Sequence, residues 1–91
     1  MSHDPITDIL TERGKAYGLF ISQAGTSQEL KTSMQIRNGW DQLEPDMQEA
    51  LELIAMKMSR ILHGNPDHID SWDDIAGYAR LVADRLRGVV R

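Results

Sequence analysis

The clearest hydrophobic periodicity in the chain lies between Pro45 and Gly64, where apolar residues return at helical spacing. Proline is favoured at the first position of a helix and glycine just after its end, so one long central helix is expected here. Its apolar face consists of Met47, Leu51, Ile54, Met58, Ile61 and Leu62. Leu53 and Met56 lie on the opposite side, which predicts packing against two surfaces, one of which could belong to another subunit.

A second amphipathic segment runs from Ser71 to Arg87 and predicts the last helix. Its apolar face consists of Trp72, Ile75, Ala76, Ala79, Val82, Ala83 and Leu86. The loop before it, "NPDHID", is short, and short connections join antiparallel neighbours. The central and last helices are therefore expected to form a hairpin with Trp72 and Ile75 in the core.

The N-terminal half carries weaker signals. Asp4 before Pro5 is typical of a helix N-cap followed by proline at the first helical position. Gly18 interrupts the pattern, and Thr26 with Glu29 offers a capping box for a further helix. Helices are expected over 5–16 and 26–35, with a turn at 37–40. Because strand signals are nearly absent, the fold class is all-α, with three to four helices in one domain over residues 1–91.

Composition narrows the function classes. A chain of 91 residues with 41% hydrophobic content has room for one modest core, which favours assembly as a homo-oligomer. Its net charge of -4 disfavours bulk nucleic-acid binding, and it contains no cysteine for a disulfide or a thiolate metal site. No secretory signal or membrane span is recognisable, so a cytoplasmic protein with no membrane contact is expected.

Carboxylates gather at the start of the last helix, where Asp70, Asp73 and Asp74 surround Ser71. A capping box formed by Ser71 and Asp74, with Asp73 near the positive end of the helix dipole, explains two of the three. The alternative is a metal site. Gly77, one turn on, weakens the helix and either makes room for a ligand or allows tight helix packing.

The central helix offers a matching pair of carboxylates. Glu49 and Glu52 are three residues apart, so their side chains leave the same side of the helix and could bracket one ion. In an antiparallel hairpin, however, most of a helix length would separate this pair from Asp70 and Asp73. A shared site needs a slanted crossing, an offset between the helices, or a second subunit.

Four further residues are candidates for nucleotide binding. Lys57 and Arg60 could neutralise phosphate oxygens, although such residues are more often solvated or paired with Glu52 or aspartates. Tyr17 and Tyr78, each beside a glycine, could stack on a base, although the common role of such a tyrosine is at the edge of a core. The three histidines share no ligand spacing and are assigned no role.

Two resemblances bear on these candidates. "QEALE" followed by "DSWD" resembles the magnesium-binding pattern of all-α nucleoside triphosphate pyrophosphohydrolases of the MazG and dimeric dUTPase type, with Gln48 and Asp70 standing where that pattern has Glu. The resemblance implies Mg²⁺ held by Glu49, Glu52, Asp70 and Asp73. The segments "ILTERGKAYGLF" and "DSWDDIAGYA" resemble a family of small phage and prophage proteins, which implies a phage protein in the cytoplasm of an infected or lysogenic bacterium.

Two functions are therefore expected as alternatives. In one, a phage-encoded protein binds a nucleotide and hydrolyses it with Mg²⁺, as a MazG-like pyrophosphohydrolase would. In the other, a counter-defence protein sequesters a nucleotide signal or binds a host protein without turnover. Removing the carboxylates separates the two, because an enzyme would lose Mg²⁺-dependent turnover whereas a sequestering protein would keep its ligand.

Overall fold

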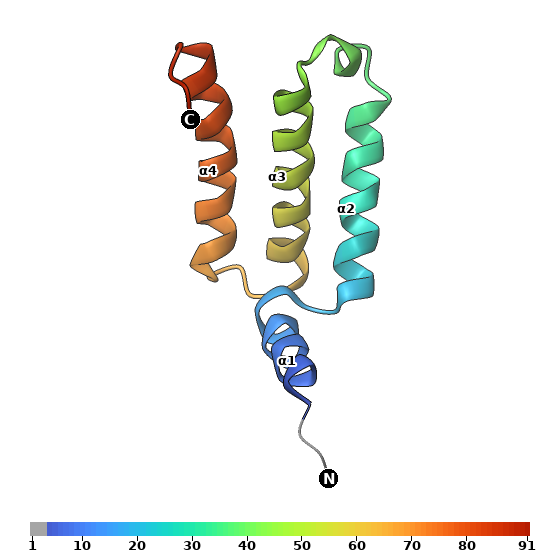
Figure 1. The fold of residues 1–91 in the computed structure, drawn as a ribbon. Helices are drawn as coiled ribbons and strands as arrows, with labels where there is room; N and C mark the ends of the chain where they lie inside the picture. Colours follow the sequence, from blue (N-terminus) through green and yellow to red (C-terminus); the bar gives the residue numbers. More distant parts are fainter. Residues whose placement is uncertain (1–3) are drawn as a thin grey trace.

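The computed structural model describes residues 4–91 and shows an all-α fold (Figure 1). Its elements are α1 (Pro5–Tyr17), α2 (Phe20–Gln35), the short 3-10 helix η1 (Trp40–Gln42), α3 (Pro45–His63) and α4 (Ile69–Leu86). The described residues contain no strand, which confirms the predicted fold class. None of these helices combines the length and the apolar character that a bilayer crossing requires.

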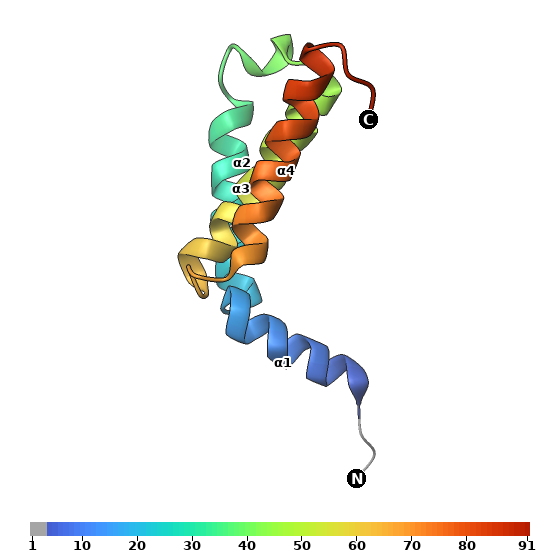
Figure 2. The same ribbon diagram turned by 90° about the vertical axis from the view of Figure 1, so that its left-hand side faces the viewer.

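Three of the helices lie side by side in one layer, with α3 between α2 and α4 (Figure 1). α3 packs against both neighbours, and α3 and α4 form the predicted antiparallel hairpin. α1 leaves the lower end of this layer at an angle (Figure 2), which makes the molecule elongated at 53 × 29 × 24 Å.

The helix boundaries marked by proline and glycine are where the sequence places them. Asp4 caps α1 by accepting hydrogen bonds from the Ile6 amide at 3.0 Å and the Thr7 hydroxyl at 2.8 Å. Pro45 begins α3 and Gly64 ends it. These predictions are confirmed, because a residue that lacks an amide hydrogen or a side chain imposes its boundary locally.

Two predicted helix starts are wrong. α2 begins at Phe20, so Thr26 lies inside the helix, where its hydroxyl meets His63 Nε2 at 2.6 Å instead of capping. α4 begins at Ile69, so Ser71 is an interior residue that is buried against the rest of the layer and caps nothing. Packing against α3 favours the longer helices over the local capping signals, as tertiary contacts often do.

The buried apolar core is small. Among the described residues, only Ala50 and Ala55 are fully buried apolar residues. The prediction that Trp72 and Ile75 lie in the core is corrected, because Trp72 is 51% exposed and Ile75 is half-buried. Leu53 contributes to a hollow between α3 and α4, so the second surface that α3 packs against is α4 of the same chain.

Candidate functional site

A close crossing of two chain segments anchors α1 to the layer. Gly18, which ends α1, has a φ of 79°, and a Cβ there would lie 2.0 Å from the carbonyl oxygen of His63. A Cβ on Gly64 would lie 2.3 Å from the carbonyl oxygen of Ala16. The Asn65 amide donates to that same oxygen at 2.8 Å. Both glycines are therefore needed for the end of α1 to lie against the end of α3.

The crossing brings together two of the predicted nucleotide-binding residues. The guanidinium carbon of Arg60 lies 4.4 Å from the centre of the Tyr17 ring, within range of a cation–π interaction. The His68 ring meets Tyr17 edge-on, with ring centres 5.3 Å apart. Because Arg60 covers one face of Tyr17, that face is closed to a nucleotide base.

Arg60 has an unsatisfied hydrogen-bond donor. Its Nε is buried and has no acceptor among the described residues. A buried donor without a partner costs about 1–3 kcal/mol, because it has lost its hydrogen bond to water. Neighbouring atoms cover this Nε, so an acceptor supplied by a ligand would recover that energy once they move aside.

Arg60 borders a hollow of about 490 Å³ where α1 turns into α2. The lining is Leu10, Arg13, Gly14, Tyr17, Gly18, Leu19, Phe20, Gln23 and Arg60. Its charged members are both cationic, although the whole chain carries a net charge of -4. Phe20, at 78% exposure, offers an accessible aromatic ring, and Gln23 offers a buried amide. The hollow combines positive charge for an anion with a flat apolar surface for a ring.

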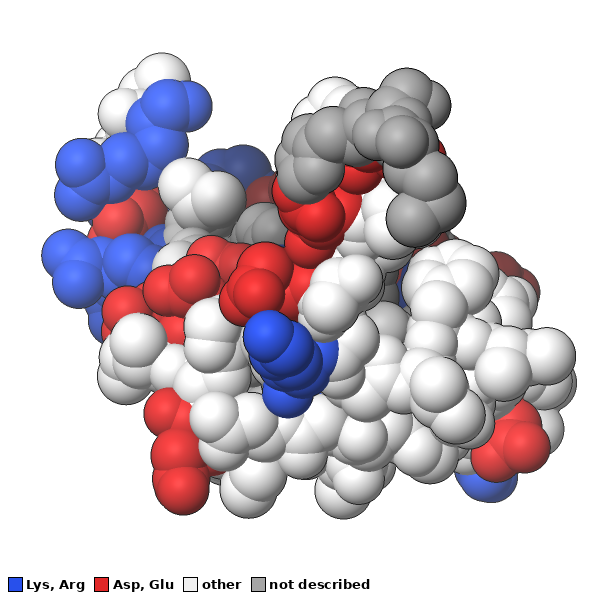
Figure 3. All heavy atoms as spheres, turned by 90° about the horizontal axis from the view of Figure 1, so that it is seen from below, with Lys and Arg blue, Asp and Glu red and all other residues white. Residues whose placement is uncertain are grey.

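A second hollow lies around the same tyrosine, next to the loop between α3 and α4. It measures about 400 Å³ and includes Asn65 and His68 with several residues of α1. Its charge is mixed, because Lys15 is paired with Glu12 at 3.1 Å. Figure 3 views the molecule from this end and shows acidic side chains in the middle of the view and basic ones towards the α4 side.

The carboxylates proposed as magnesium ligands are not gathered within one chain. Glu49 lines the hollow between α3 and α4, whereas Glu52 is turned to α2 and accepts a hydrogen bond from Gln35 at 3.0 Å. Asp70 lies 3.5 Å from His68 Nε2 at the start of α4, and Asp73 is exposed.

The register of the hairpin explains this separation. The ion pairs Asp46–Arg85 and Lys57–Asp74 place Glu49 level with the second half of α4, about two and a half turns beyond Asp73. No group of three or more metal-capable His, Asp or Glu side chains occurs within residues 4–91. A site that uses all four carboxylates would have to draw on a second chain.

The other two nucleotide-binding candidates lie away from the crossing. Lys57 is buried in the α3–α4 interface, where its ammonium pairs with Asp74 at 2.8 Å. This is the pairing with an aspartate that the sequence offered as the alternative to phosphate binding. Tyr78 lines a hollow of about 250 Å³ between α3 and α4, together with Glu49 and Leu53.

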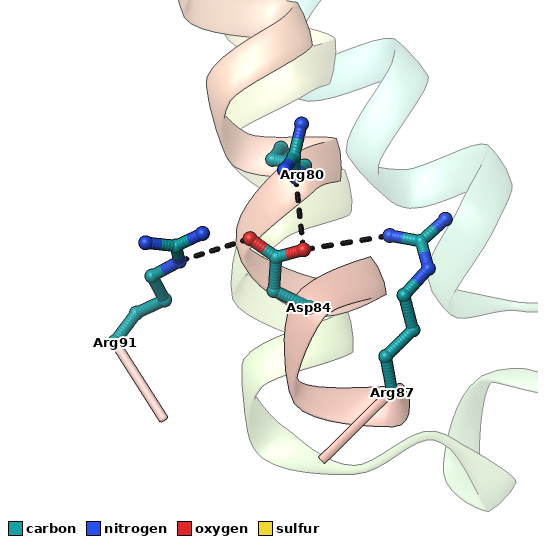
Figure 4. A network of polar contacts seen from close by, with 4 residues as sticks. All are labelled: Arg80, Asp84, Arg87 and Arg91. Carbon is teal, nitrogen blue, oxygen red and sulfur yellow. Dashed lines mark hydrogen bonds and ion pairs between the residues drawn. The ribbon is translucent and has the colours of Figure 1, made fainter. Parts of the chain in front are cut away.

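A further charged cluster is centred on Asp84 at the end of α4 (Figure 4). Its carboxylate is buried and accepts hydrogen bonds from Arg80 at 2.8 Å, Arg91 at 2.9 Å and Arg87 at 3.4 Å. The hydrogen bond from Arg80 holds the pKa of Asp84 below its ordinary value, against the opposing effect of burial. The amide of Val89 donates to the Asp84 carbonyl at 2.8 Å. The cluster therefore ties the C-terminal residues to α4.

Sequence reasoning missed three residues of the hollow, namely Arg13, Phe20 and Gln23. Arg13 lies within the helix predicted over 5–16, where nothing indicates a site, and Phe20 follows the break at Gly18. No local signal marked Gln23. The common signal is the pair of glycines, because close approach of two backbones is what brings these residues to Arg60.

The fold and the hollow define a small all-α protein with a cationic, aromatic-edged recess beside a layer of three helices. The chain belongs to a family whose model is described as a domain of unknown function (DUF6378), which matches residues 7–86. No curated protein and no solved structure matches the chain.

Proposed function

We propose that this protein binds a nucleotide, or an anion derived from one, in the hollow beside Arg60. The observation that carries the proposal is Arg60, which borders a recess whose charged lining is wholly cationic and whose buried Nε lacks an acceptor. The volume of about 490 Å³ lies in the range of small-molecule sites. Phosphate oxygens would accept hydrogen bonds from Arg60 and Arg13, because guanidinium groups suit such anions.

The base is expected to stack on Phe20, whose ring is exposed at the edge of the same hollow. Tyr17 then has a different role from the one its sequence context suggested. By holding Arg60 in a cation–π contact, it would fix the position of the guanidinium beside the hollow. The amide of Gln23 lies within the lining and can recognise polar groups of the ligand.

Hydrolysis of the bound nucleotide with Mg²⁺ is a separate proposal. Glu49, Glu52, Asp70 and Asp73 would hold the ion only if a second chain supplied part of the set, since one chain keeps the two pairs apart. Bound Mg²⁺ would neutralise triphosphate oxygens and activate water. Without Mg²⁺, the protein would sequester its ligand, as the counter-defence alternative requires.

The test is a panel of nucleoside triphosphates, cyclic nucleotides, nucleosides and inorganic triphosphate, each measured with and without Mg²⁺. Binding should raise the melting temperature by at least about 5 °C at a ligand concentration of 100 Kd. Arg60→Met and Phe20→Ala should each reduce this shift, whereas Arg37→Met, an exposed arginine bonded to the Ser33 carbonyl, should not. If the ligand raised the melting temperature of Arg60→Met as much as that of the unchanged protein, this hollow would not be the binding site. Product analysis of the same samples decides between hydrolysis and sequestration.

A further inference from the structure

The layer of helices has one face that is apolar and uncovered. α3 contributes Met47, Leu51, Ile54, Met58 and Leu62, and α4 contributes Trp72, Ala76, Ala79, Ala83 and Leu86; together these ten residues are named the open face. None of them is fully buried. Leu51 is 39% exposed, Leu62 67% and Leu86 63%. Large apolar side chains on a helix normally face a core, so this surface lacks a partner.

Helix geometry places the two stripes on the same side of the layer. Each residue advances an α-helix by about 100°, so the stripe on α3 lies roughly a quarter-turn from Ala50 and Leu53, which face α4. The stripe on α4 likewise lies roughly a quarter-turn from Tyr78 and Val82, which face α3. Because the helices are antiparallel (Figure 1), these rotations of opposite sense lead to one common side.

The contact between α2 and α3 supports this placement. Leu51, Ile54 and Met58 also line a hollow of about 400 Å³ with Leu30 and Met34 of α2. The open face therefore continues into an apolar groove towards α2, while the other side of α3 carries Glu49.

We infer that a second copy of this chain covers the open face, so that two three-helix layers stack to form a two-layered bundle. Domains are stable when an apolar helix face is buried against another layer, and one chain supplies only a single layer. The stripe on α4 repeats at alternating steps of four and three residues, which is the spacing of helices that pack along their length.

The shape of the open face matches a copy of itself. The α4 stripe carries the small side chains of Ala76, Ala79 and Ala83, whereas the α3 stripe carries the larger Leu51 and Met58, which are 39% and 41% exposed. In a two-fold dimer the same patch is used by both partners, so the larger side chains of one copy can pack over the alanines of the other. Small residues allow the helix axes to approach closely.

The exposed area is sufficient for such an interface. A compact monomer of 10.3 kDa would expose about 5,400 Å², whereas this chain exposes 6707 Å². The excess of about 1,300 Å² includes the surface of α1, which projects from the layer, and it is larger than the roughly 800 Å² that each partner buries in a standard stable interface. This inference does not depend on nucleotide binding.

Sedimentation equilibrium of the full chain at micromolar concentrations tests the inference. The unchanged protein should be a dimer, and Ala79→Arg should weaken its association at least about 100-fold, because each copy would bury an unpaired charge. The matched control is Gly77→Arg, which adds the same charge to the same helix where a Cβ has nothing within 4 Å and which lies on another side of α4.

A second variant keeps the result decisive if Ala79→Arg disturbs folding. Met58→Arg places the charge on the α3 stripe at a side chain that is 41% exposed, and circular dichroism monitors the helix content of every variant. A monomeric unchanged protein would overturn the inference. So would a dimer that survives both Ala79→Arg and Met58→Arg with their helices intact, or one that Gly77→Arg dissociates equally.

Discussion

Replacing Gly64 with alanine should detach α1 from the layer. The new Cβ would lie 2.3 Å from the Ala16 carbonyl oxygen and 2.4 Å from backbone atoms of Tyr17, and backbone atoms cannot move aside as a flexible side chain can. α1 must therefore shift as a whole. None of its residues is buried, so little else holds it in place.

The energy at stake can be estimated from the contacts that would be lost. The hydrogen bond from Asn65 to Ala16 contributes about 1 kcal/mol, and the cation–π contact of Arg60 with Tyr17 about 0.5–2 kcal/mol. The edge-on contact of Tyr17 with His68 adds about 0.5–1 kcal/mol. The docking of α1 should thus weaken by about 2–4 kcal/mol.

Circular dichroism, hydrogen exchange and nucleotide binding together measure this effect. A detached helix of 13 residues is marginal in water, so Gly64→Ala should lose helical signal up to the share of α1 and lose protection there, while α2, α3 and α4 keep theirs. Gly77→Ala, where the new Cβ meets nothing within 4 Å, is the control and should stabilise the protein by about 0.5–1 kcal/mol. Full protection of α1 in Gly64→Ala, with unchanged ligand binding, would show that the glycine is not needed for the docking of α1.

Three further predictions concern the charged groups. Asp74→Asn should destabilise the fold by about 1–3 kcal/mol in urea denaturation, because it leaves the buried Lys57 ammonium without its carboxylate. Lys57→Met should be neutral or stabilising, because it removes the buried charge. Equal losses of stability from both variants would contradict this prediction. Hydrogen bonds from arginine lower the pKa values of Asp84 and Asp46 in the folded protein. Both carboxylates therefore stabilise the fold at a pH above their unfolded pKa of about 3.8, and this stability is lost as the pH falls through the lower folded pKa. Acid unfolding that is unaltered in Asp84→Asn would count against this. If Mg²⁺ binds the proposed carboxylates, Asp70→Asn should weaken a saturable calorimetric signal at millimolar Mg²⁺ with little change in stability, and no signal from the unchanged protein would exclude that binding.

The parts of the fold that sequence reasoning predicted correctly depend on local constraints. Pro45 and Gly64 act on the residues next to them, so the limits of α3 are readable from the chain alone. Ser71 and Thr26 are different, because a capping signal competes with tertiary packing, and both residues lie within helices in the structure. The apolar stripe of α3 was recognised, but periodicity cannot tell whether a stripe meets the same chain or another one.

The candidate site was less predictable for a related reason. Tyr17 and Arg60 were selected one by one, and nothing in their spacing indicates that they touch. Their contact follows from the backbone crossing at Gly18 and Gly64, which is a long-range feature. Lys57 had the residue type of a phosphate ligand, but its position in the α3–α4 interface commits it to an ion pair.

A bound nucleotide is proposed to supply the acceptor that the Nε–H of Arg60 lacks, and nuclear magnetic resonance can follow that hydrogen itself. In a nuclear magnetic resonance titration with the nucleoside triphosphate that gives the largest melting shift, the Arg60 Nε–H resonance should move saturably, because a hydrogen bond to a phosphate oxygen forms there. The resonance is identified by its loss in Arg60→Lys, and the Nε–H of Arg37 at the other end of α2 should not move. An Arg60 signal that stays fixed while the triphosphate saturates the protein would show that no hydrogen bond forms at this donor.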